Sequence, residues 1–202
     1  MFFRLARKFL LFALLAAFVA GALVLWRSGD ALYRAEELLS FGRFHRYDKF
    51  IENAGRKYGV DPMLVKAVVW RESRFQPEKV GKNGERGLMQ VTEGAAADWA
   101  KTNKMATFVP TDLFSPKTNL EAGTWYLKQA MNRYAGKDDP LTFALAEYNA
   151  GHRRMSQWLG NTNMGERATS GDLRDSISIP NTRSYVDAIL ARYRFYKARG
   201  RL

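Results

Sequence analysis

Signals that start an α-helix recur along most of this 202-residue chain and constrain its fold more than any other feature. Each signal is a side chain that caps the first turn, a proline that suits the first helical position, or both. They lie at Asp61-Pro62, Thr92, Asn119, Asp139-Pro140 and Pro180. They predict five helices. The first follows Asp61, the next three cover 93–102, 120–135 and 140–150, and the last runs from Pro180 to about residue 197.

The stretches between these signals show no convincing alternation of apolar and polar residues, which a half-buried strand would require. The chain is therefore predicted to be mainly α. Gly- and polar-rich segments separate the helices and predict irregular loops at 76–87, 103–118 and 160–179. Loops of that length in a compact domain are often the places where a ligand is bound.

The composition indicates a folded chain without metal chemistry. A hydrophobic fraction of 47% with 26% charged residues is enough to bury a core, which excludes a mostly disordered polymer. The absence of Cys rules out disulfides and thiolate metal sites. His45 and His152 are isolated in the sequence and form no ligand cluster of the kind that zinc needs. We therefore expect no metal ion and no cofactor.

An uncharged run from Phe9 to Trp26 predicts a membrane segment at the amino terminus. As a helix it would extend roughly 27 Å, close to the thickness of the hydrocarbon core of a bilayer. Arg4, Arg7 and Lys8 precede the run, and positive residues tend to stay on the cytoplasmic side. The predicted topology is a single transmembrane helix that leaves everything after Trp26 exported.

A cleavable signal peptide is the alternative, because Ala20-Gly21-Ala22 offers an A-x-A cleavage pattern. We favour the anchor, since the run is longer than the usual signal-peptide core of about 7–15 residues. Both interpretations export the domain. The predicted organisation is a signal anchor at 1–30, a juxtamembrane linker at 31–43 that is partly helical through Ala31–Leu39, and one helical domain at 44–202.

Basic residues account for a formal net charge of +12 and gather near the carboxyl end. The last predicted helix carries Arg192, Arg194, Lys197, Arg199 and Arg201. Such a helix attracts any anionic polymer, whether nucleic acid, cell-wall polymer or phospholipid head group. Because an exported domain rarely meets nucleic acid, no nucleic-acid partner is expected.

Glu72 lies at the end of an apolar stripe on the helix that follows Asp61. The stripe is spaced by three and four residues and consists of Leu64, Val65, Val68 and Val69. From spacing alone, Glu72 could simply reach water past the helix end. If it points into a cleft instead, burial would raise its pKa and keep a proton on it, as a general acid requires.

The residues that accompany Glu72 favour the second interpretation. Short strings follow one another in a fixed order: Glu72-Ser73-x-Phe75, Gly87-Leu88-Met89-Gln90, Ala122-Gly123-x-x-Tyr126-Leu127, Tyr148-Asn149-Ala150-Gly151, and Ile179-Pro180 with Thr182-Arg183-x-Tyr185-Val186. In order and spacing, over about 45–198, the chain strongly resembles the catalytic domain of soluble lytic transglycosylases.

The resemblance implies a goose-type-lysozyme-like α fold and cleavage of the β-1,4 bond between N-acetylmuramic acid and N-acetylglucosamine in peptidoglycan. It also implies Glu72 as a single catalytic acid and base, with the muramic acid 6-hydroxyl as the attacking group and a 1,6-anhydromuramic end as the product. The partners that the resemblance implies are peptidoglycan glycan strands. The uncharged run over 9–26 adds the membrane as a partner, and together the two predict a bacterial inner membrane with the domain in the periplasm.

The resemblance assigns substrate binding to residues near the acid: Ser73, Met89, Gln90, Tyr148, Asn149 and Tyr185. Gln90 offers a donor and an acceptor to a sugar, and the two Tyr can stack a ring and donate a hydroxyl. Taken without the resemblance, Ser73 and Asn149 could equally bond backbone, and Met89 and the Tyr residues could be core.

The chain also departs from the family pattern. Asn181 stands where many members have Glu, Gly81 where a Ser often lies, and Glu147 at a commonly small position. The first two departures could weaken hydrogen bonding to substrate, and Glu147 raises the possibility of a second carboxylate. A lysozyme-type hydrolase and a non-catalytic peptidoglycan-binding scaffold therefore remain as alternatives.

Overall fold

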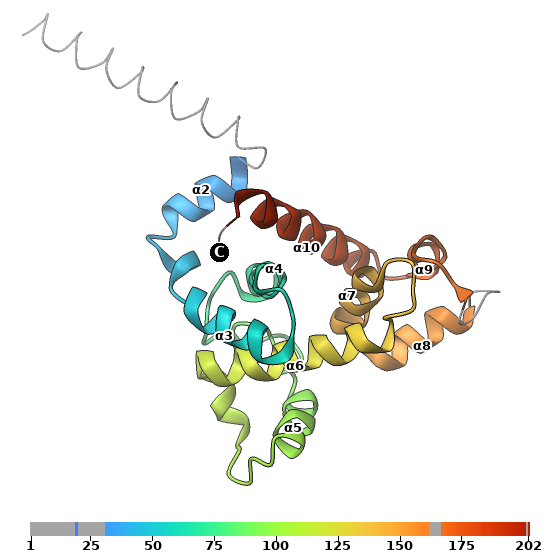
Figure 1. Ribbon diagram of the computed structural model, residues 1–202, viewed down its shortest axis with the longest axis horizontal. Helices are drawn as coiled ribbons and strands as arrows, with labels where there is room; N and C mark the ends of the chain where they lie inside the picture. Colours follow the sequence, from blue (N-terminus) through green and yellow to red (C-terminus); the bar gives the residue numbers. More distant parts are fainter. Residues whose placement is uncertain (1–18, 20–30, 162–166, 201) are drawn as a thin grey trace, which may run out of the picture. The chain divides into compact units, whose positions relative to one another are not determined.

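The computed structural model describes residue 19, residues 31–161, residues 167–200 and residue 202 (Figure 1). The chain divides into two units, the first ending at Phe44 and the second running from His45 to Leu202. Nearly all of the predicted signal anchor at 1–30 lies outside the described residues, so its helix stays a prediction. Within the part of the chain that is described, no helix is long and apolar enough to cross a membrane.

The described part of the first unit is helical. It contains α2 (Ala31–Leu39), which confirms the helix predicted in the linker, and most of the short 3₁₀ helix η1 (Arg43–His45). The rings of Tyr33 and Phe44 pack against each other with their centroids 5.6 Å apart. Leu38, Leu39 and Phe41 are exposed.

The second unit is an assembly of helices, which confirms the mainly α prediction. In chain order they are α3 (Asp48–Tyr58), α4 (Pro62–Ser73), α5 (Glu93–Thr102), η2 (Pro110–Phe114), α6 (Pro116–Arg133), α7 (Pro140–Ala150), α8 (His152–Asn161), α9 (Ser170–Ser176) and α10 (Pro180–Arg199). Over the described ranges there is no strand, and isolated bridges join only Val80 to Arg86 and Arg86 to Val91.

Three of the predicted N-caps are confirmed by hydrogen bonds to the first turns of their helices. Asp61 accepts a hydrogen bond from the backbone N–H of Met63 at 2.9 Å, and Thr92 accepts one from Ala95 at 3.3 Å. Asp139 accepts one from Thr142 at 3.4 Å. Each bond satisfies a backbone donor that the first turn of a helix leaves without a partner.

The predicted cap at Asn119 is wrong. The helix begins earlier, at Pro116, because proline fits the first helical position and lacks the N–H that would otherwise need a partner. Asn119 therefore lies inside α6, where its side chain is buried. Two more boundaries differ from the prediction: α6 ends at Arg133, and α9 forms within the predicted loop at 160–179.

Helix α4 is buried on nearly all sides rather than along one stripe. Every residue from Leu64 to Trp70 is buried, and Lys66 is fully enclosed with its Nζ 2.6 Å from Asp48 Oδ1. The helix packs against α3 and α10, and α10 also packs against α7. A helix held so tightly is a rigid support for the residues at its carboxyl end.

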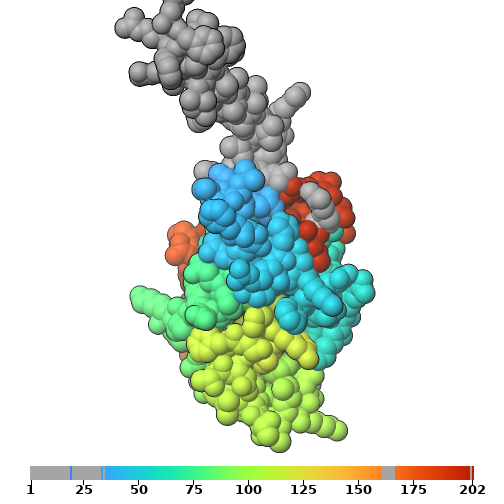
Figure 2. Space-filling view, turned by 90° about the vertical axis from the view of Figure 1, so that its left-hand side faces the viewer, coloured from blue at the N-terminus to red at the C-terminus, as the bar shows by residue number. Residues whose placement is uncertain are grey.

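Helix α6 runs through the middle of the second unit, with α3, α5 and α7 packed against it (Figure 1). Figure 2 shows the segment that carries α5, η2 and α6, coloured green to yellow, gathered at the end of the unit that lies at the bottom of the view. The candidate site is built from the carboxyl end of α4, the loop before α5, the carboxyl end of α7 and the start of α10.

Candidate active site

Glu72 lies in the last turn of α4, one residue before its end. Arg74 follows in the left-handed region with φ 52°, which ends the helix and turns the chain away. The Glu72 side chain is half-buried, and the hydroxyl of Tyr185, on α10, donates to its Oε1 at 2.6 Å. Tyr185 is itself buried, so the acid is positioned by a side chain that has little freedom.

The surroundings of Glu72 favour its protonated form. Burial raises its pKa to about 7, although the Tyr185 hydrogen bond and the positive charges of Arg71 and Lys79 act in the opposite direction. The negative charge of Glu85 adds to the increase. A carboxyl group whose pKa lies near neutrality can give up a proton and take one back at physiological pH.

A compact loop between α4 and α5 lies beside this acid, and Lys79 in the loop binds the Glu72 backbone carbonyl through its Nζ. Backbone hydrogen bonds join Arg86 and Val91 in both directions at 3.0 Å, and the N–H of Gly87 donates to the carbonyl of Lys79 at 2.8 Å. Gly87 has φ 77°, and a Cβ there would lie 2.3 Å from Asn119 Nδ2, so only glycine fits. The Gly-Leu-Met-Gln string is therefore a turn whose shape depends on glycine.

Asn119 fixes this loop to α6. Its Oδ1 accepts from the backbone N–H of Met89 at 2.8 Å, and its Nδ2 donates to the carbonyls of Arg86 at 2.7 Å and Leu113 at 2.9 Å. The sequence predicts a helix cap at Asn119 and gives no indication of this role. A polar residue inside the helix after a proline was the signal that could have identified it.

Gln90 is partly buried within the loop and lies in the left-handed region with φ 48°. Its Nε2 donates to the carbonyls of Lys79 and Gly87, both at 3.0 Å. Because both partners can only accept, the amide nitrogen is fixed on their side and Oε1 points the other way. The Nε2 group of Gln90, predicted to donate to a sugar, thus donates within the protein, and Oε1 is the atom of this amide that remains for a sugar.

Ser73 and Met89, both predicted to bind substrate, have buried side chains. The Ser73 hydroxyl is buried, donates to the carbonyl of Val69 at 3.3 Å and accepts from the backbone N–H of Gln76 at 3.3 Å. The Met89 side chain is fully buried against Gly123, where a Cβ would lie 2.7 Å from its sulfur. Both residues therefore shape the site through the backbone and the core.

Tyr148 and Asn149 bring the end of α7 into the same site. The Tyr148 hydroxyl donates to the carbonyl of Met89 at 2.9 Å, and its ring meets that of Tyr126 edge-on at 5.7 Å. Burial and the nearby charge of Glu72 raise the pKa of Tyr148, so its hydroxyl keeps its proton. Asn149 is exposed and its Oδ1 accepts from the Thr182 hydroxyl at 2.7 Å.

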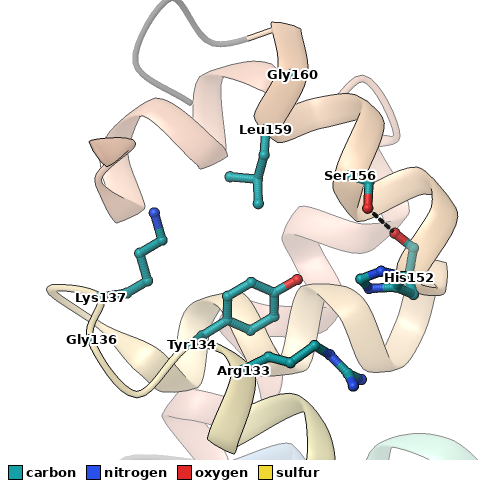
Figure 3. Close-up of a pocket in the computed structure, with 8 residues that line it drawn as sticks. All are labelled: Arg133, Tyr134, Gly136, Lys137, His152, Ser156, Leu159 and Gly160. Carbon is teal, nitrogen blue, oxygen red and sulfur yellow. Dashed lines mark hydrogen bonds between the residues drawn. The ribbon is translucent and has the colours of Figure 1, made fainter. Parts of the chain in front are cut away.

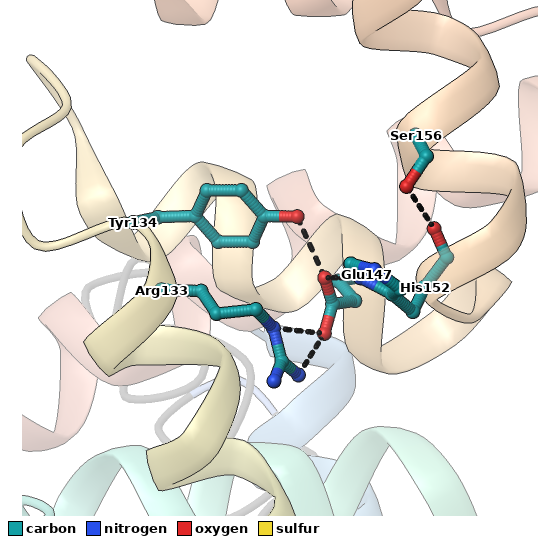
Figure 4. Close-up of polar contacts among 5 residues, drawn as sticks. All are labelled: Arg133, Tyr134, Glu147, His152 and Ser156. Atoms are coloured by element: carbon teal, nitrogen blue, oxygen red, sulfur yellow. Dashed lines mark hydrogen bonds and ion pairs between the residues drawn. The ribbon is translucent and has the colours of Figure 1, made fainter. Parts of the chain in front are cut away.

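Glu147 belongs to a separate polar cluster with Arg133, Tyr134 and His152 (Figure 4). Its carboxylate is fully buried and accepts from Arg133 Nε at 3.0 Å and from the Tyr134 hydroxyl at 2.6 Å, while His152 Nδ1 lies 3.0 Å from it. Burial opposes its ionisation, but the hydrogen bonds from Arg133, His152 and Tyr134 outweigh burial and lower its pKa. Both oxygens of Glu147 are thus occupied by the protein.

A cavity of about 580 Å³ adjoins this cluster (Figure 3). It is lined by Arg133, Tyr134, Gly136, Lys137, His152, Ser156, Leu159 and Gly160. These residues include neither Glu72 nor any of its partners. Among the His, Asp and Glu of the described ranges, no group of three or more is placed to hold a metal ion.

The candidate site therefore brings together Glu72, Gln90, Tyr148, Asn149 and Tyr185 around one partly buried acid. A family model described as "Transglycosylase SLT domain" matches residues 49–170, which is more than half of the chain. The chain belongs to this family. The resemblance drawn from the sequence strings is confirmed, and the SLT match includes Glu72 and the Tyr-Asn string of α7.

Solved structures of this family share the fold. The 70 kDa soluble lytic transglycosylase from Escherichia coli is similar with a TM-score of 0.66 and 28% identity over 75% of this chain and 24% of that one. A complex of the 70-kDa enzyme with bulgecin A gives a TM-score of 0.67 and 28% identity over 77% of this chain and 25% of that one.

An inactive mutant of the lytic transglycosylase Slt from Pseudomonas aeruginosa gives a TM-score of 0.65 and 24% identity over 77% of this chain and 24% of that one. The chain thus spans about a quarter of the length of these structures. The lysozyme-like helical SLT fold is common to all of them.

Proposed function

We propose that this chain is a peptidoglycan lytic transglycosylase that cleaves the β-1,4 bond between N-acetylmuramic acid and N-acetylglucosamine. The observation that carries the proposal is the state of Glu72: a half-buried acid whose pKa is raised to about 7 by its surroundings, held by Tyr185 at the end of a rigid helix. Membership of the SLT family and the likeness to soluble lytic transglycosylases support the choice of substrate.

In the first step the protonated Glu72 donates its proton to the glycosidic oxygen, and the bond from the muramic acid C1 to that oxygen breaks. Positive charge develops at C1 and the sugar ring, and the 2-acetamido group of the substrate stabilises it. The Glu72 carboxylate that remains is stabilised by the Tyr185 hydroxyl and by the positive charges of Arg71 and Lys79.

In the second step the ionised Glu72 takes the proton of the muramic acid 6-hydroxyl as that oxygen attacks C1. The product is a 1,6-anhydromuramic end, Glu72 recovers its proton, and no water is consumed. One carboxylate serves as acid and then as base, in contrast to the pair used by ordinary glycosidases. The enzyme is therefore formally a lyase and needs no cofactor.

The remaining site residues bind and position the strand. Gln90 Oε1, the exposed Asn149 amide and the ring of Tyr148 are the groups that we assign to substrate contact. Ser73 and Met89 act indirectly, by fixing the backbone beside Glu72 and the carbonyl that receives the Tyr148 hydroxyl. A displacement of these groups by about 1 Å is enough to cost a large part of the rate.

The arrangement of Glu147 favours the lyase over a hydrolase in which that residue activates water. A general base must have an oxygen free to accept a proton from water. Arg133, Tyr134 and His152 occupy both oxygens of Glu147, and its pKa is lowered, which makes it a poor base. We assign Glu147 to the stability of the fold.

We further propose that the domain works in the periplasm, tethered to the inner membrane by a helix over 9–26. The support is the uncharged run after Arg4, Arg7 and Lys8 together with a substrate that lies outside the cytoplasm. The short segment at 31–43 then spaces the domain from the bilayer.

The experiment compares the full chain in detergent with Glu72→Gln on purified sacculi, and measures the release of soluble muropeptides. Gln keeps the size of the side chain but cannot donate a carboxyl proton. We expect a loss of about 1,000-fold in rate, the usual size for the removal of a general acid–base group. Equal rates would contradict the proposal, and a wild-type chain that binds sacculi without releasing muropeptides would instead establish the scaffold.

A further inference from the structure

Three large apolar side chains at the end of α2 and in the turn after it are exposed to solvent. Leu38 is 72% exposed, Leu39 74% and Phe41 93%. Val80, the next most exposed large hydrophobic residue within the described ranges, is 58% exposed. We call Leu38, Leu39 and Phe41 the α2 patch. Apolar side chains that are exposed together, rather than singly, are typical of a surface that contacts another molecule or a membrane.

The packing of the first unit directs the two leucines outward. Tyr33 marks the inner side of α2, because it is buried and its ring packs against that of Phe44. A helix turns by about 100° per residue, so Leu38 and Leu39 lie on faces that point away from Tyr33. The inner side of α2 is therefore already occupied by the protein, and the outer side carries the apolar surface.

Phe41 is held at the tip of a turn. It lies in the left-handed region with φ 49°, and Gly42 follows with φ 80°. The backbone N–H of Ser40 donates to the carbonyl of Glu37 at 3.2 Å, and the N–H of Arg43 donates to the carbonyl of Ser40 at 3.0 Å. A bulky residue in the left-handed region stores strain, which is typical of positions that a function requires. The exposure of Phe41 thus belongs to a turn closed by hydrogen bonds, not to a frayed helix end.

The position of the α2 patch along the chain indicates a bilayer as its partner. The uncharged run proposed as the tether ends at Trp26, and only residues 27–30 separate it from the first residue of α2. A connection of this length reaches at most about 18 Å, even when it is fully extended. The tether therefore keeps the patch near the membrane surface, where the effective concentration of lipid is high.

The charges beside the patch favour contact through the apolar side chains rather than through anionic head groups. Glu36 and Glu37 precede the patch, and Arg43 follows it. A segment of this composition gains little from the negative surface potential that attracts basic segments to membranes. Insertion of apolar side chains at the boundary between head groups and acyl chains depends instead on the apolar area that is buried.

Resting on the proposed tether, we propose that the α2 patch inserts into the head-group region of the bilayer in which the chain is anchored. The segment at 31–43 is then a second membrane contact as well as a spacer. Three side chains are a weak anchor by themselves, since even one myristoyl chain binds a membrane only reversibly. The tether makes the contact lasting, and the contact determines which side of α2 faces the membrane.

The absence of Cys from the chain allows a fluorescent reporter at a single position. The full-length protein with Leu39→Cys is labelled with the environment-sensitive fluorophore NBD and reconstituted into phosphatidylcholine liposomes, with or without a lipid that carries a spin-label quencher near its head group. We expect the quencher to remove about half of the emission, because an inserted side chain lies about 5–10 Å into the boundary between head groups and acyl chains. The same fluorophore at Val109→Cys, an exposed position between α5 and η2, should keep its emission.

Further variants test whether the patch itself causes the insertion. Adding Leu38→Ser and Phe41→Ser to the labelled Leu39→Cys chain should remove most of the quenching. Met105→Ser with Val109→Ser is the matched control, because it replaces two exposed apolar side chains of the second unit, and it should leave the quenching unchanged. Quenching should also be equal at about 0.1 M and about 1 M NaCl, since salt screens charge attraction but not apolar contact.

The outcomes separate this contact from the tether and from the enzyme activity. An unquenched fluorophore on a chain that floats with the liposomes overturns the contact and leaves the tether intact. Quenching that survives the two Ser changes, or disappears at high salt, also overturns it. Excimer emission from pyrene on the same Cys without quenching by lipid would show that a second copy covers the patch instead. A chain that does not float with the liposomes overturns the tether and the contact together, and muropeptide release from sacculi reports on the lyase independently.

Discussion

The ionisation of Glu72 carries a cost in stability that can be measured. Its pKa is 4.5 in an ordinary environment and about 7 in the fold, so the folded state binds the extra proton between these values. The wild-type protein should therefore lose about 3 kcal/mol of unfolding free energy as the pH rises from 4.5 to 7. Glu72→Gln has no proton to lose at this position.

We accordingly expect Glu72→Gln to be more stable than the wild type at pH 8 and to differ little from it at pH 4.5. Urea unfolding followed by circular dichroism at both pH values measures the difference. Equal stability of the two proteins at pH 8 would show that the carboxylate is not buried as described.

Tyr185 sets the pH at which Glu72 ionises. Its hydroxyl donates to the carboxylate and so opposes the rise in pKa caused by burial. In Tyr185→Phe the pKa of Glu72 should rise further, and the alkaline limb of kcat/KM should move to higher pH. We also expect a rate about tenfold lower at pH 6, because the acid is less well positioned. A profile that keeps the wild-type limb would remove Tyr185 from the role assigned to it.

At the scale of elements, Glu147 joins the end of α6 to α7 and α8. Glu147→Gln should cost about 2 kcal/mol of unfolding free energy at pH 7, because hydrogen bonds from Arg133 and Tyr134 are lost or reversed. This loss is smaller than that expected for a fully buried ion pair, because Arg133 is partly exposed. Its lowered pKa means that this stabilisation is present above the ordinary pKa and disappears as the pH falls through the folded value.

Urea unfolding at pH 7 and at pH 3 measures both parts of this prediction. The control is Glu52→Gln, which breaks an exposed pair with Arg56 and should change stability by no more than about 0.5 kcal/mol. A loss for Glu147→Gln no larger than that of the control would mean that the cluster contributes nothing to the fold.

The loop that carries Gln90 depends on Gly87. Gly87→Ala places a methyl group 2.3 Å from Asn119 Nδ2 at a φ of 77°, so the contact between the loop and α6 must open. We expect a loss of stability of about 2 kcal/mol together with at least a tenfold loss in kcat/KM, since Gln90 and the Met89 carbonyl move with the loop. Thermal unfolding and muropeptide release measure the two effects, and wild-type values for both would contradict the account of the loop.

The helices that begin at Pro62, Glu93, Pro140 and Pro180 could be predicted from the sequence, because caps and prolines act locally, as Asp61 and Asp139 show. The role of Asn119 could not be predicted in this way. Pro116 sets the start of α6, and the Asn119 amide therefore lies inside the helix, where it bonds a loop far away in the sequence. The burial of Met89 depends in the same way on the room left by Gly123. Glu85 belongs to none of the strings, and only the folded loop shows that its carboxylate fills the space over Gly81.

For the whole molecule, the central prediction outside the active site is the membrane tether. The full chain should remain with the membrane fraction after washing at pH 11, whereas a chain starting at residue 31 and exported by an unrelated cleavable signal peptide should be released without detergent. The run over 9–26 is long enough to hold the chain in the bilayer without help from charge. Release of the full chain by the wash would favour the cleaved signal peptide.

In the proposed mechanism Glu72 alone acts as acid and base, so that the substrate's own hydroxyl completes the reaction. Mass spectrometry of muropeptides released from purified sacculi tests it most directly, with Glu72→Gln beside the wild type. We predict 1,6-anhydromuramic ends from the wild type and none from the variant. Reducing ends from the wild type would mean that water is the attacking group, and would contradict the lyase mechanism.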